Sequence, residues 1–281
     1  MLLLLASCGG AGKRAEQAAE VQPAKTLHIV SLSGTTTEIL CDLGMESNIV
    51  GVDVTSTYPV SVSKLPKVGH NRNVSAEAVI ALKPELVIGI DENIRPELKE
   101  QLQQAGIRMM LFHLESSVAG TKSLIQALAD SLGAGAKAEA INTQIDTDLK
   151  DTVSLTQKIK VLFIYARGVG TMMIAGKHTY PNAMIELAGA ENAATDFEDF
   201  KPMTPESLLK ANPDVILMFD SGLESLGGMN GLLEVPGIKM TSAGKNKKVV
   251  EMDGQLLTGF GPRLGKAIAE LSKKLNEAGA R

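Results

Sequence analysis

One pattern of residues occurs twice along this chain, 129 positions apart. In the first copy, Ser75-Ala76-Glu77 opens a helix, Pro84 ends it, and the apolar pair Val87-Ile88 follows. The second copy runs with the same spacing from Thr204-Pro205-Glu206 to Ile216-Leu217. Serine and threonine are favoured helix N-caps, and strands that alternate with helices are typical of parallel α/β units. The repeat therefore predicts two α/β lobes of similar architecture.

Strands alternate with helices on both sides of a strand-free stretch in the middle of the chain. The expected strands are His28–Leu32, Ile49–Val52, Leu86–Ile90, Met109–Phe112, Val161–Tyr165 and Val215–Phe219. Residues 117–157 carry no proline and no strand signal, so we expect a helical connection there, with one uninterrupted helix over 136–157 that is roughly 33 Å long. Binding sites favour domain interfaces and the carboxyl ends of parallel strands. We therefore expect two Rossmann-like lobes, residues 26–116 and 158–281, joined by a long backbone helix, with a ligand cleft between the lobes.

The first residues indicate targeting rather than fold. Residues 1–8 read M-L-L-L-L-A-S-C, and an apolar run that ends in Leu-Ala-Ser-Cys resembles the lipobox of bacterial lipoproteins, in which the cysteine is lipidated. The run is too short to span a membrane, which takes about 20 apolar residues. We expect Cys8 to carry a lipid anchor outside the cytoplasm and residues 9–25 to form a flexible tether. An artificial hydrophobic extension is the alternative.

Composition and motifs exclude several classes of protein. The net charge of −4 argues against a nucleic-acid binder, which is usually basic. The sequence has no P-loop, no G-x-G-x-x-G after a strand and no G-x-S-x-G, and its four histidines (His28, His70, His113 and His178) form no i, i+4 pair for zinc. We therefore expect a binding protein rather than an enzyme. With no tryptophan and only three tyrosines, few side chains can grip a flat ligand or iron, and each can be considered singly.

Four segments carry a resemblance to a known family: Ser31–Leu40 (SLSGTTTEIL), Gly51–Pro59 (GVDVTSTYP), Leu65–Arg72 (LPKVGHNR) and Gly259–Arg263 (GFGPR). Over residues 26–278 the chain resembles the substrate-binding proteins of bacterial ABC importers for iron-siderophores, cobalamin and haem, and most closely the haem-binding branch. The resemblance implies a class III solute-binding fold and a monomer that touches the membrane only through its lipid anchor. It also implies a small-molecule ligand and, as partner, an ABC permease with a cytoplasmic ATPase.

The chain departs from the haem branch at one informative position. That branch typically reads Val-Gly-Tyr-x-Arg, with the tyrosine as axial iron ligand, whereas this chain reads Val68-Gly69-His70-Asn71-Arg72. Imidazole is itself a standard axial haem ligand. The resemblance therefore implies that His70 ligates the iron of haem, the transported ligand, and that Arg72 is free to pair with a haem propionate. The alternative is a polar loop histidine that serves another ligand.

The resemblance implies further ligand contacts. Arg263 is a candidate partner of a propionate, because guanidinium binds carboxylate in a bidentate manner; its alternative is a surface charge at a helix start. Arg167 stands where some haem-branch members have a second iron-binding histidine, and it is either a carboxylate partner or a solvated loop cation. His178 is a candidate second axial ligand and Tyr58 a candidate ligand contact. For these two, an exposed position beside a helix cap and a packing role, respectively, are the favoured alternatives.

Glu77 and Glu206 occupy equivalent positions in the two copies of the repeat. In related importers one glutamate per lobe at this place docks on arginines of the permease, and the resemblance implies the same for these two. A carboxylate in the first helical turn also favours the helix dipole, so capping is a second role that each can fulfil. The alternative cargo is a ferric siderophore or cobalamin, and a haem-handling enzyme is a more remote alternative.

Overall fold

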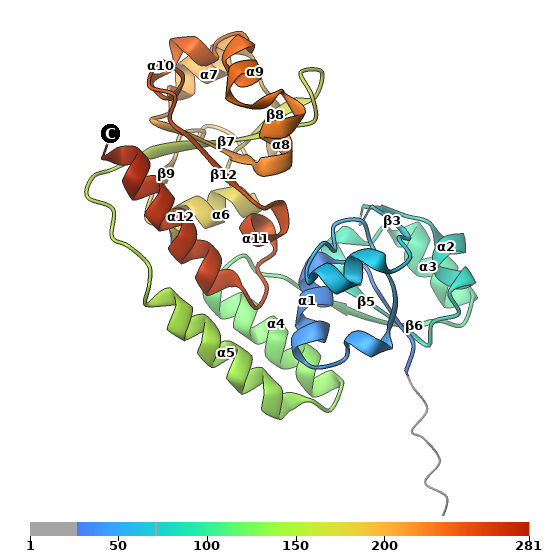
Figure 1. Ribbon diagram of the computed structural model, residues 1–281. Helices are drawn as coiled ribbons and strands as arrows, with labels where there is room; N and C mark the ends of the chain where they lie inside the picture. Colours follow the sequence, from blue (N-terminus) through green and yellow to red (C-terminus); the bar gives the residue numbers. More distant parts are fainter. Residues whose placement is uncertain (1–26, 71, 281) are drawn as a thin grey trace, which may run out of the picture.

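The computed structural model describes residues 27–70 and 72–280 (Figure 1). The expected lipid anchor at Cys8 and the expected tether, residues 9–25, lie outside the described residues. Within the described ranges the chain forms two α/β lobes joined by helices, which confirms the predicted fold class (Figure 1).

The N-terminal lobe has a parallel sheet of order β2-β1-β5-β6. Its strands and helices are β1 (Ile29–Ser31), α1 (Gly34–Asp42), β2 (Ile49–Val52), α2 (Ala76–Ala81), β5 (Leu86–Ile90), α3 (Pro96–Gln104) and β6 (Arg108–Phe112), with short 3-10 turns at Glu46–Asn48, Val60–Lys64 and Asp91–Asn93. A two-stranded antiparallel ribbon, β3 (Gly69–His70) and β4 (Asn73–Val74), forms a separate small sheet. All five residues of β5 are apolar or glycine and all are buried, as expected for a central strand that is covered on both faces.

The C-terminal lobe has a six-stranded mixed sheet. Its main order is β10-β8-β7-β11-β12, and β9 also pairs with β7. The strands are β7 (Lys160–Ala166), β8 (Met172–Ala175), β9 (Glu191–Asn192), β10 (Phe200–Pro202), β11 (Val215–Phe219) and β12 (Val249–Met252). The helices are α6 (Tyr180–Leu187), α7 (Pro205–Ala211), α8 (Asp220–Ser225), α9 (Gly228–Glu234), α10 (Ser242–Lys245), α11 (Gly254–Thr258) and α12 (Leu264–Gly279), with a 3-10 turn at Ile238–Met240.

The connection between the lobes is a helical hairpin, α4 (Val118–Ser131) and α5 (Gly135–Leu149), which packs on α12 (Figure 1). The single helix expected over 136–157 is wrong at its C-terminal end, because α5 stops at Leu149. Beyond it, the backbone N–H of Val153 donates to the Ser272 hydroxyl at 3.0 Å and that of Thr156 donates to Asn276 Oδ1 at 3.3 Å. These bonds to α12 replace the helical ladder in a stretch whose β-branched residues favour helix only weakly.

The internal repeat is present in the structure. Strands β5 and β11 begin and end 129 residues apart, and so do the caps of the helices that precede them. Ser75 accepts a hydrogen bond from the backbone N–H of Ala78, and Thr204 accepts one from that of Ser207. The two lobes therefore share one local register from helix cap to strand end.

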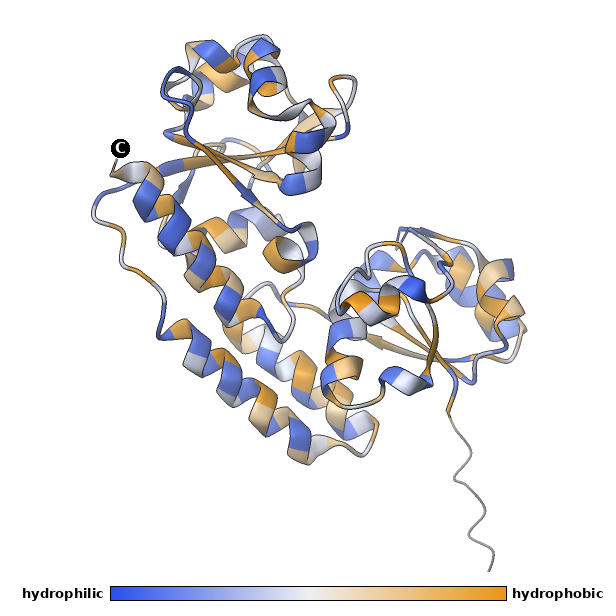
Figure 2. Cartoon of the chain, viewed as in Figure 1, coloured by the Kyte–Doolittle hydropathy of each residue, from blue (hydrophilic) through white to orange (hydrophobic). Residues whose placement is uncertain are grey.

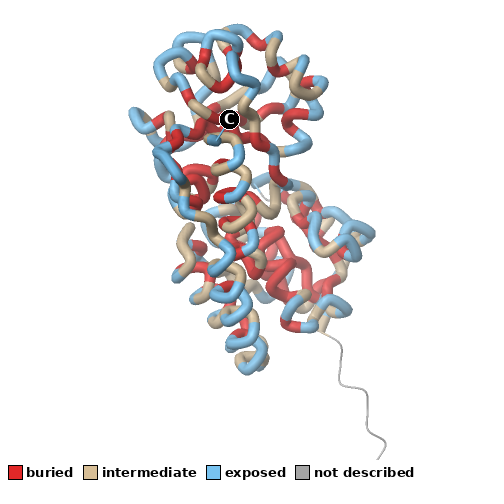
Figure 3. The backbone as a smooth tube through the Cα atoms, turned by 60° about the vertical axis from the view of Figure 1, so that its left-hand side comes forward, coloured by how far each residue is buried: buried red, intermediate tan, exposed pale blue. Residues whose placement is uncertain are grey.

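One hydrophobic cluster runs through both lobes. It joins apolar residues of β1, α1 and β5 to those of α4, α5 and α12 and to β7 and β11. Figure 2 shows the sheets as mainly hydrophobic and the outer helices as mixed, and Figure 3 shows the buried residues concentrated within the lobes and along the joining helices. Because the core is continuous across the connection, the joining helices are anchored in both lobes.

Candidate functional site

Segments at the carboxyl ends of strands from both sheets meet where the lobes touch. The loop after β1 leads into α1, the loop after β2 carries Tyr58, and α11 follows β12. Gln255 of α11 contacts the first two, and the Thr35 hydroxyl donates to the carbonyl oxygen of Gly259. We call this contact the interlobe seam; its members are Gly34, Thr35, Glu38, Thr57 and Tyr58 of the N-terminal lobe and Gln255, Gly259 and Arg263 of the C-terminal lobe.

Arg263 has a carboxylate partner within the protein. Its Nε and Nη2 each donate to Glu38 at 2.9 Å, and its backbone N–H donates to the same carboxylate at 3.2 Å. The Arg263 and Glu38 side chains are only 20% and 5% exposed. The guanidinium carbon also lies 3.6 Å from the centroid of the Tyr58 ring. The structure thus brings Tyr58 and Arg263 together, but in a contact that spans the lobes.

His70 lies at the end of β3 and is exposed. Its Nδ1 accepts a hydrogen bond from the backbone N–H of Arg72 at 3.3 Å. In this arrangement the neutral ring carries its proton on Nε2, so ligation of a metal through Nε2 requires the proton to move and the Arg72 bond to break. Arg72 is exposed, and within the described residues its side chain forms no ion pair. An exposed imidazole and a free guanidinium therefore lie two residues apart.

Arg167 lies in the turn between β7 and β8, where its backbone N–H donates to Thr171 at 2.9 Å. It is exposed, and it too forms no ion pair within the described part of the chain. Two residues earlier, half-buried Tyr165 packs edge-on against Phe219 at 6.2 Å. Tyr165 and Arg167 therefore lie two positions apart at the carboxyl end of β7.

Sequence analysis missed Tyr165, although a signal for it existed. Tyr165-Ala166-Arg167 has the Tyr-x-Arg spacing that the haem branch places in the other lobe, where this chain has His70-Asn71-Arg72. The seam residues Glu38 and Gln255 were missed as well. Glu38 is marked only as a charged residue in the middle of helix α1, and nothing in the sequence marks Gln255.

His178 is engaged elsewhere. It precedes the N-cap Thr179 of α6, has a left-handed backbone (φ 59°), and its exposed ring lies 3.6 Å from the carboxylate of Glu198 in the same lobe. This is the favoured alternative of the sequence analysis, an exposed residue beside a helix cap. His113 is likewise exposed and pairs with Glu92, which raises its pKa chiefly through the hydrogen bond.

Tyr180 of the C-terminal lobe lies near two charged residues of the N-terminal lobe. It begins α6 and packs against Phe260 with ring centroids 5.5 Å apart. Burial and the charge of Glu92 raise the pKa of Tyr180, and the charge of Arg72 opposes that shift. Because Arg72 and Glu92 belong to the N-terminal lobe, the Tyr180 phenol lies within electrostatic reach of the loop that carries His70.

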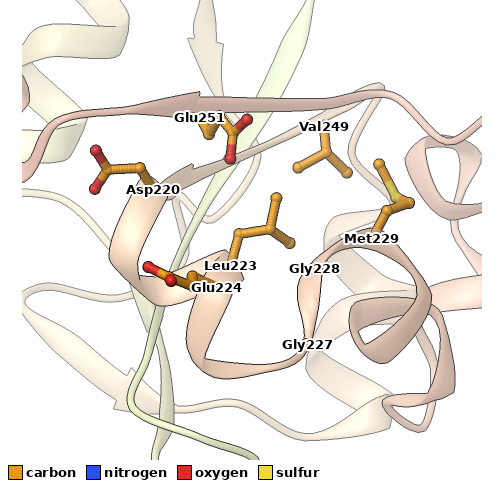
Figure 4. Close-up of a pocket in the computed structure, with 8 residues that line it drawn as sticks. All are labelled: Asp220, Leu223, Glu224, Gly227, Gly228, Met229, Val249 and Glu251. Carbon is orange, nitrogen blue, oxygen red and sulfur yellow. The ribbon is translucent and has the colours of Figure 1, made fainter.

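A hollow of about 630 Å³ lies on the C-terminal lobe beside α8, α9 and β12, and contains none of the expected site residues (Figure 4). Its charged groups are the carboxylates of Asp220, Glu224 and Glu251. Three carboxylates repel an anionic ligand, so this hollow does not suit a dicarboxylate such as haem. Within residues 27–70 and 72–280, no group of three or more His, Cys, Asp or Glu side chains is arranged to hold a metal ion.

Glu77 and Glu206 are exposed in the first turns of α2 and α7. The backbone N–H of Glu77 and the hydroxyl of Ser75, which lies 2.8 Å from Oε2, lower the pKa of Glu77. One turn further along, Ile80 and Leu209 are 40% and 42% exposed at equivalent positions of the repeat. The two helices thus present the same pair, a carboxylate followed by an apolar side chain.

No helix in the described part of the chain is long and apolar enough to cross a membrane.

The chain matches one protein family and is similar to substrate-binding and cobalamin-binding proteins. The periplasmic binding protein family matches residues 29–256. An uncharacterised ABC transporter substrate-binding lipoprotein, YvrC of Bacillus subtilis, is 32% identical over 88% of this chain and 79% of its own. A cobalamin-binding protein of Halobacterium salinarum is 25% identical over 87% of this chain and 68% of its own.

Among solved structures, the periplasmic haem-binding protein RhuT from Roseiflexus sp. RS-1 in its apo form is 37% identical, with a TM-score of 0.85 over 90% of this chain and 99% of its own. The periplasmic haem-binding protein BhuT in complex with two haems is 34% identical, with a TM-score of 0.83 over 89% and 98%. The extent of the family match and the similarity to these proteins lead to one conclusion: this chain belongs to the periplasmic binding protein family.

Proposed function

We propose that this protein captures haem outside the cytoplasm and delivers it to an ABC permease, with no catalytic step of its own. The observation that carries the proposal is the exposed imidazole of His70. It occupies the axial-ligand position of the haem-branch motif on a chain that is 37% and 34% identical to two haem-binding proteins. The lipoprotein name of the Bacillus relative supports an extracytoplasmic, lipid-anchored location through Cys8.

Several side chains of the two lobes have the chemistry that haem requires. Imidazole binds haem iron, and Arg72 and Arg167, one from each lobe, offer guanidinium groups for the two propionates. Tyr165 offers a phenol from the C-terminal lobe as a second axial ligand, beside Arg167. Tyr58 and His178 remain weaker candidates, because Tyr58 lies under Arg263 and His178 pairs with Glu198.

The test is absorbance titration of the purified protein with hemin. We expect His70→Ala to lose the histidine-type Soret band and most of the affinity, whereas the matched variant His113→Ala, at an exposed histidine that pairs with Glu92, keeps both. His70→Tyr restores binding with a phenolate-type spectrum, because tyrosine is the residue of the haem branch at this position. A His70→Ala protein with an unchanged Soret band and affinity would refute the iron-ligand assignment.

A cobalamin cargo is the second candidate, since a cobalamin-binding protein is among the relatives. A cobalamin already carries its own axial base, so its binding does not depend on an imidazole at position 70. Parallel titrations with hemin, cobalamin and a ferric siderophore separate the cargoes. Saturable binding of cobalamin or siderophore alone would overturn the haem proposal.

We also propose that Glu77 and Glu206 dock the protein on its permease. Two equivalent exposed carboxylates, one on each lobe, fit a partner that presents two equivalent basic sites. The neighbouring Ile80 and Leu209 supply apolar area at the same contact.

A further inference from the structure

We propose that Gln255, Glu38 and Arg263 form an interlobe clamp that positions Tyr58 and sets the spacing of the two lobes, so that Arg263 acts by positioning and not by binding a propionate. The inference rests on the proposed haem function only for its second test. Its first test needs no ligand.

Gln255 is the centre of the clamp. Its side-chain oxygen accepts from the backbone N–H of Thr57 at 2.8 Å, the Thr57 hydroxyl at 2.9 Å and the backbone N–H of Tyr58 at 2.9 Å. Its side-chain nitrogen donates to the carbonyl of Gly34 at 3.0 Å and to Glu38 at 3.3 Å. All five contacts cross from the C-terminal to the N-terminal lobe; both amide hydrogens are used, and three donors share the two lone pairs of the oxygen.

Gly34 lies close to the side chain of Gln255 and to the backbone of Thr55 in its own lobe. A Cβ atom there would lie 3.0 Å from Gln255 Cδ and 3.0 Å from the carbonyl oxygen of Thr55. A side chain at position 34 would therefore press on the Gln255 carboxamide, so the small size of glycine lets Gln255 reach the N-terminal lobe.

The guanidinium of Arg263 contacts Glu38 and Tyr58, two residues that Gln255 also contacts. Its edge is bidentate to Glu38 and its face covers the Tyr58 ring, within the distance at which a cation and an aromatic ring attract. Burial lowers the pKa of Arg263, but the hydrogen bonds and charge of Glu38, together with the charges of Tyr58 and Asp253, raise it overall. A ligand carboxylate would have to compete with a partner carboxylate that is already buried and correctly oriented.

The loop that carries Tyr58 is also held by hydrogen bonds within the N-terminal lobe. Buried Asp53 accepts from the Ser56 hydroxyl at 2.6 Å and from the backbone N–H of Thr55 at 3.0 Å, and Ser56 in turn contacts the Thr37 hydroxyl at 2.8 Å. The N-terminal lobe thus fixes residues 53–56, while Gln255 and Arg263 of the other lobe fix Thr57 and Tyr58. The position of Tyr58 therefore depends on how the two lobes are placed relative to each other. The contacts of Thr57 and Tyr58 in turn hold the lobes in that placement.

The first test measures hydrogen–deuterium exchange of the Thr57 and Tyr58 amides in the ligand-free protein. We expect Gln255→Leu to speed their exchange about tenfold, since both amides lose their acceptor. The matched variant Gln144→Leu, which removes a carboxamide that donates only to Asp148 on the same helix, leaves it unchanged. Thr57→Val is a milder variant that removes one bond and keeps the fold, and it should speed exchange at Tyr58 by a smaller factor. Unchanged exchange in both Gln255→Leu and Thr57→Val would overturn the clamp.

The second test compares haem with haem dimethyl ester, which lacks free carboxylates. If Arg263 acts by positioning, Arg263→Gln and Gln255→Leu weaken the binding of both ligands by the same factor, about tenfold, because the walls of the site lose their preorganisation. If Arg263→Gln weakens haem alone, Arg263 is a propionate partner and its place in the clamp is wrong. A wild-type protein that binds neither ligand refutes the haem function, whereas the exchange result still decides the clamp.

Discussion

The guanidinium of Arg263 donates two hydrogen bonds to the carboxylate of Glu38, each 2.9 Å long, although the two residues are 225 positions apart and belong to different lobes. Both side chains are largely withdrawn from water. A buried ion pair of this kind adds little net stability, but loss of one partner leaves an uncompensated buried charge. The pair therefore makes the two lobes depend on each other.

Arg263→Met is accordingly expected to lower the free energy of unfolding by about 3 kcal/mol, because it leaves Glu38 buried and unpaired. The double variant Glu38→Met/Arg263→Met should recover much of that loss. Urea unfolding of the four proteins in the cycle measures the coupling. Glu270→Gln, which removes an i, i+4 pair with Lys274 inside α12, is the matched control and should change stability by less than about 0.5 kcal/mol. Strictly additive effects would contradict the expectation.

Tyr165→Phe tests the second axial ligand. Loss of the phenol oxygen should convert the haem spectrum from a two-ligand to a one-ligand form and speed haem release, with His70 still bound. Tyr58→Phe is the control, because that ring is held by Arg263 and should leave the spectrum unchanged. Identical spectra for Tyr165→Phe and the wild type would exclude Tyr165 from the iron.

Cys41 should react slowly with thiol reagents. Burial, followed by the charges of Glu46, Asp42 and Glu38, raises its pKa to about 12. At pH 8 roughly one such thiol in ten thousand is ionised, whereas a free thiol with a pKa of about 8.5 is ionised in a sizeable fraction. Iodoacetamide labelling of the folded protein, followed by mass spectrometry, should be slow at pH 8 and become rapid in urea. Fast labelling without urea would contradict the raised pKa.

Double charge reversal, Glu77→Lys/Glu206→Lys, should abolish uptake in cells while haem affinity measured in vitro stays the same. The pKa of Glu77 is lowered by its backbone N–H and by Ser75, so this carboxylate stays charged as the pH falls from 7 to 5. Docking through it should therefore hold over that range and weaken only below the ordinary carboxyl pKa. The matched reversal Glu100→Lys, on exposed α3, should leave uptake intact. Loss of haem affinity in the double variant would refute the docking role.

Local sequence patterns predicted the elements that are stabilised locally. The caps Ser75 and Thr204 and the apolar runs of β5 and β11 lie where the repeat indicated, because capping and burial act within a few residues. The end of α5 was missed because Val153 bonds to α12, more than a hundred residues away in the chain.

The candidate site likewise combines residues that a local motif identifies with residues that only distant contacts bring together. The exposed His70 and Arg72 lie two positions apart in sequence, so one motif identified them together. The partner of Arg263 could not be inferred, since one carboxylate among 32 acidic residues is not distinguished by any local pattern. Gln255 is an ordinary polar residue of a short helix, and only the tertiary contact gives it five bonds across the lobes.

The interlobe seam also imposes an order on assembly. Its N-terminal half is synthesised first, and Gln255 is added 198 residues after Thr57 and Arg263 225 residues after Glu38. Until these two residues are added, the loop of Tyr58 lacks its acceptor and Glu38 lacks its counter-charge. A nascent chain in which Gln255 and Arg263 are not yet made therefore lacks the contacts that hold the Tyr58 loop, and the seam can close only after these residues have been added.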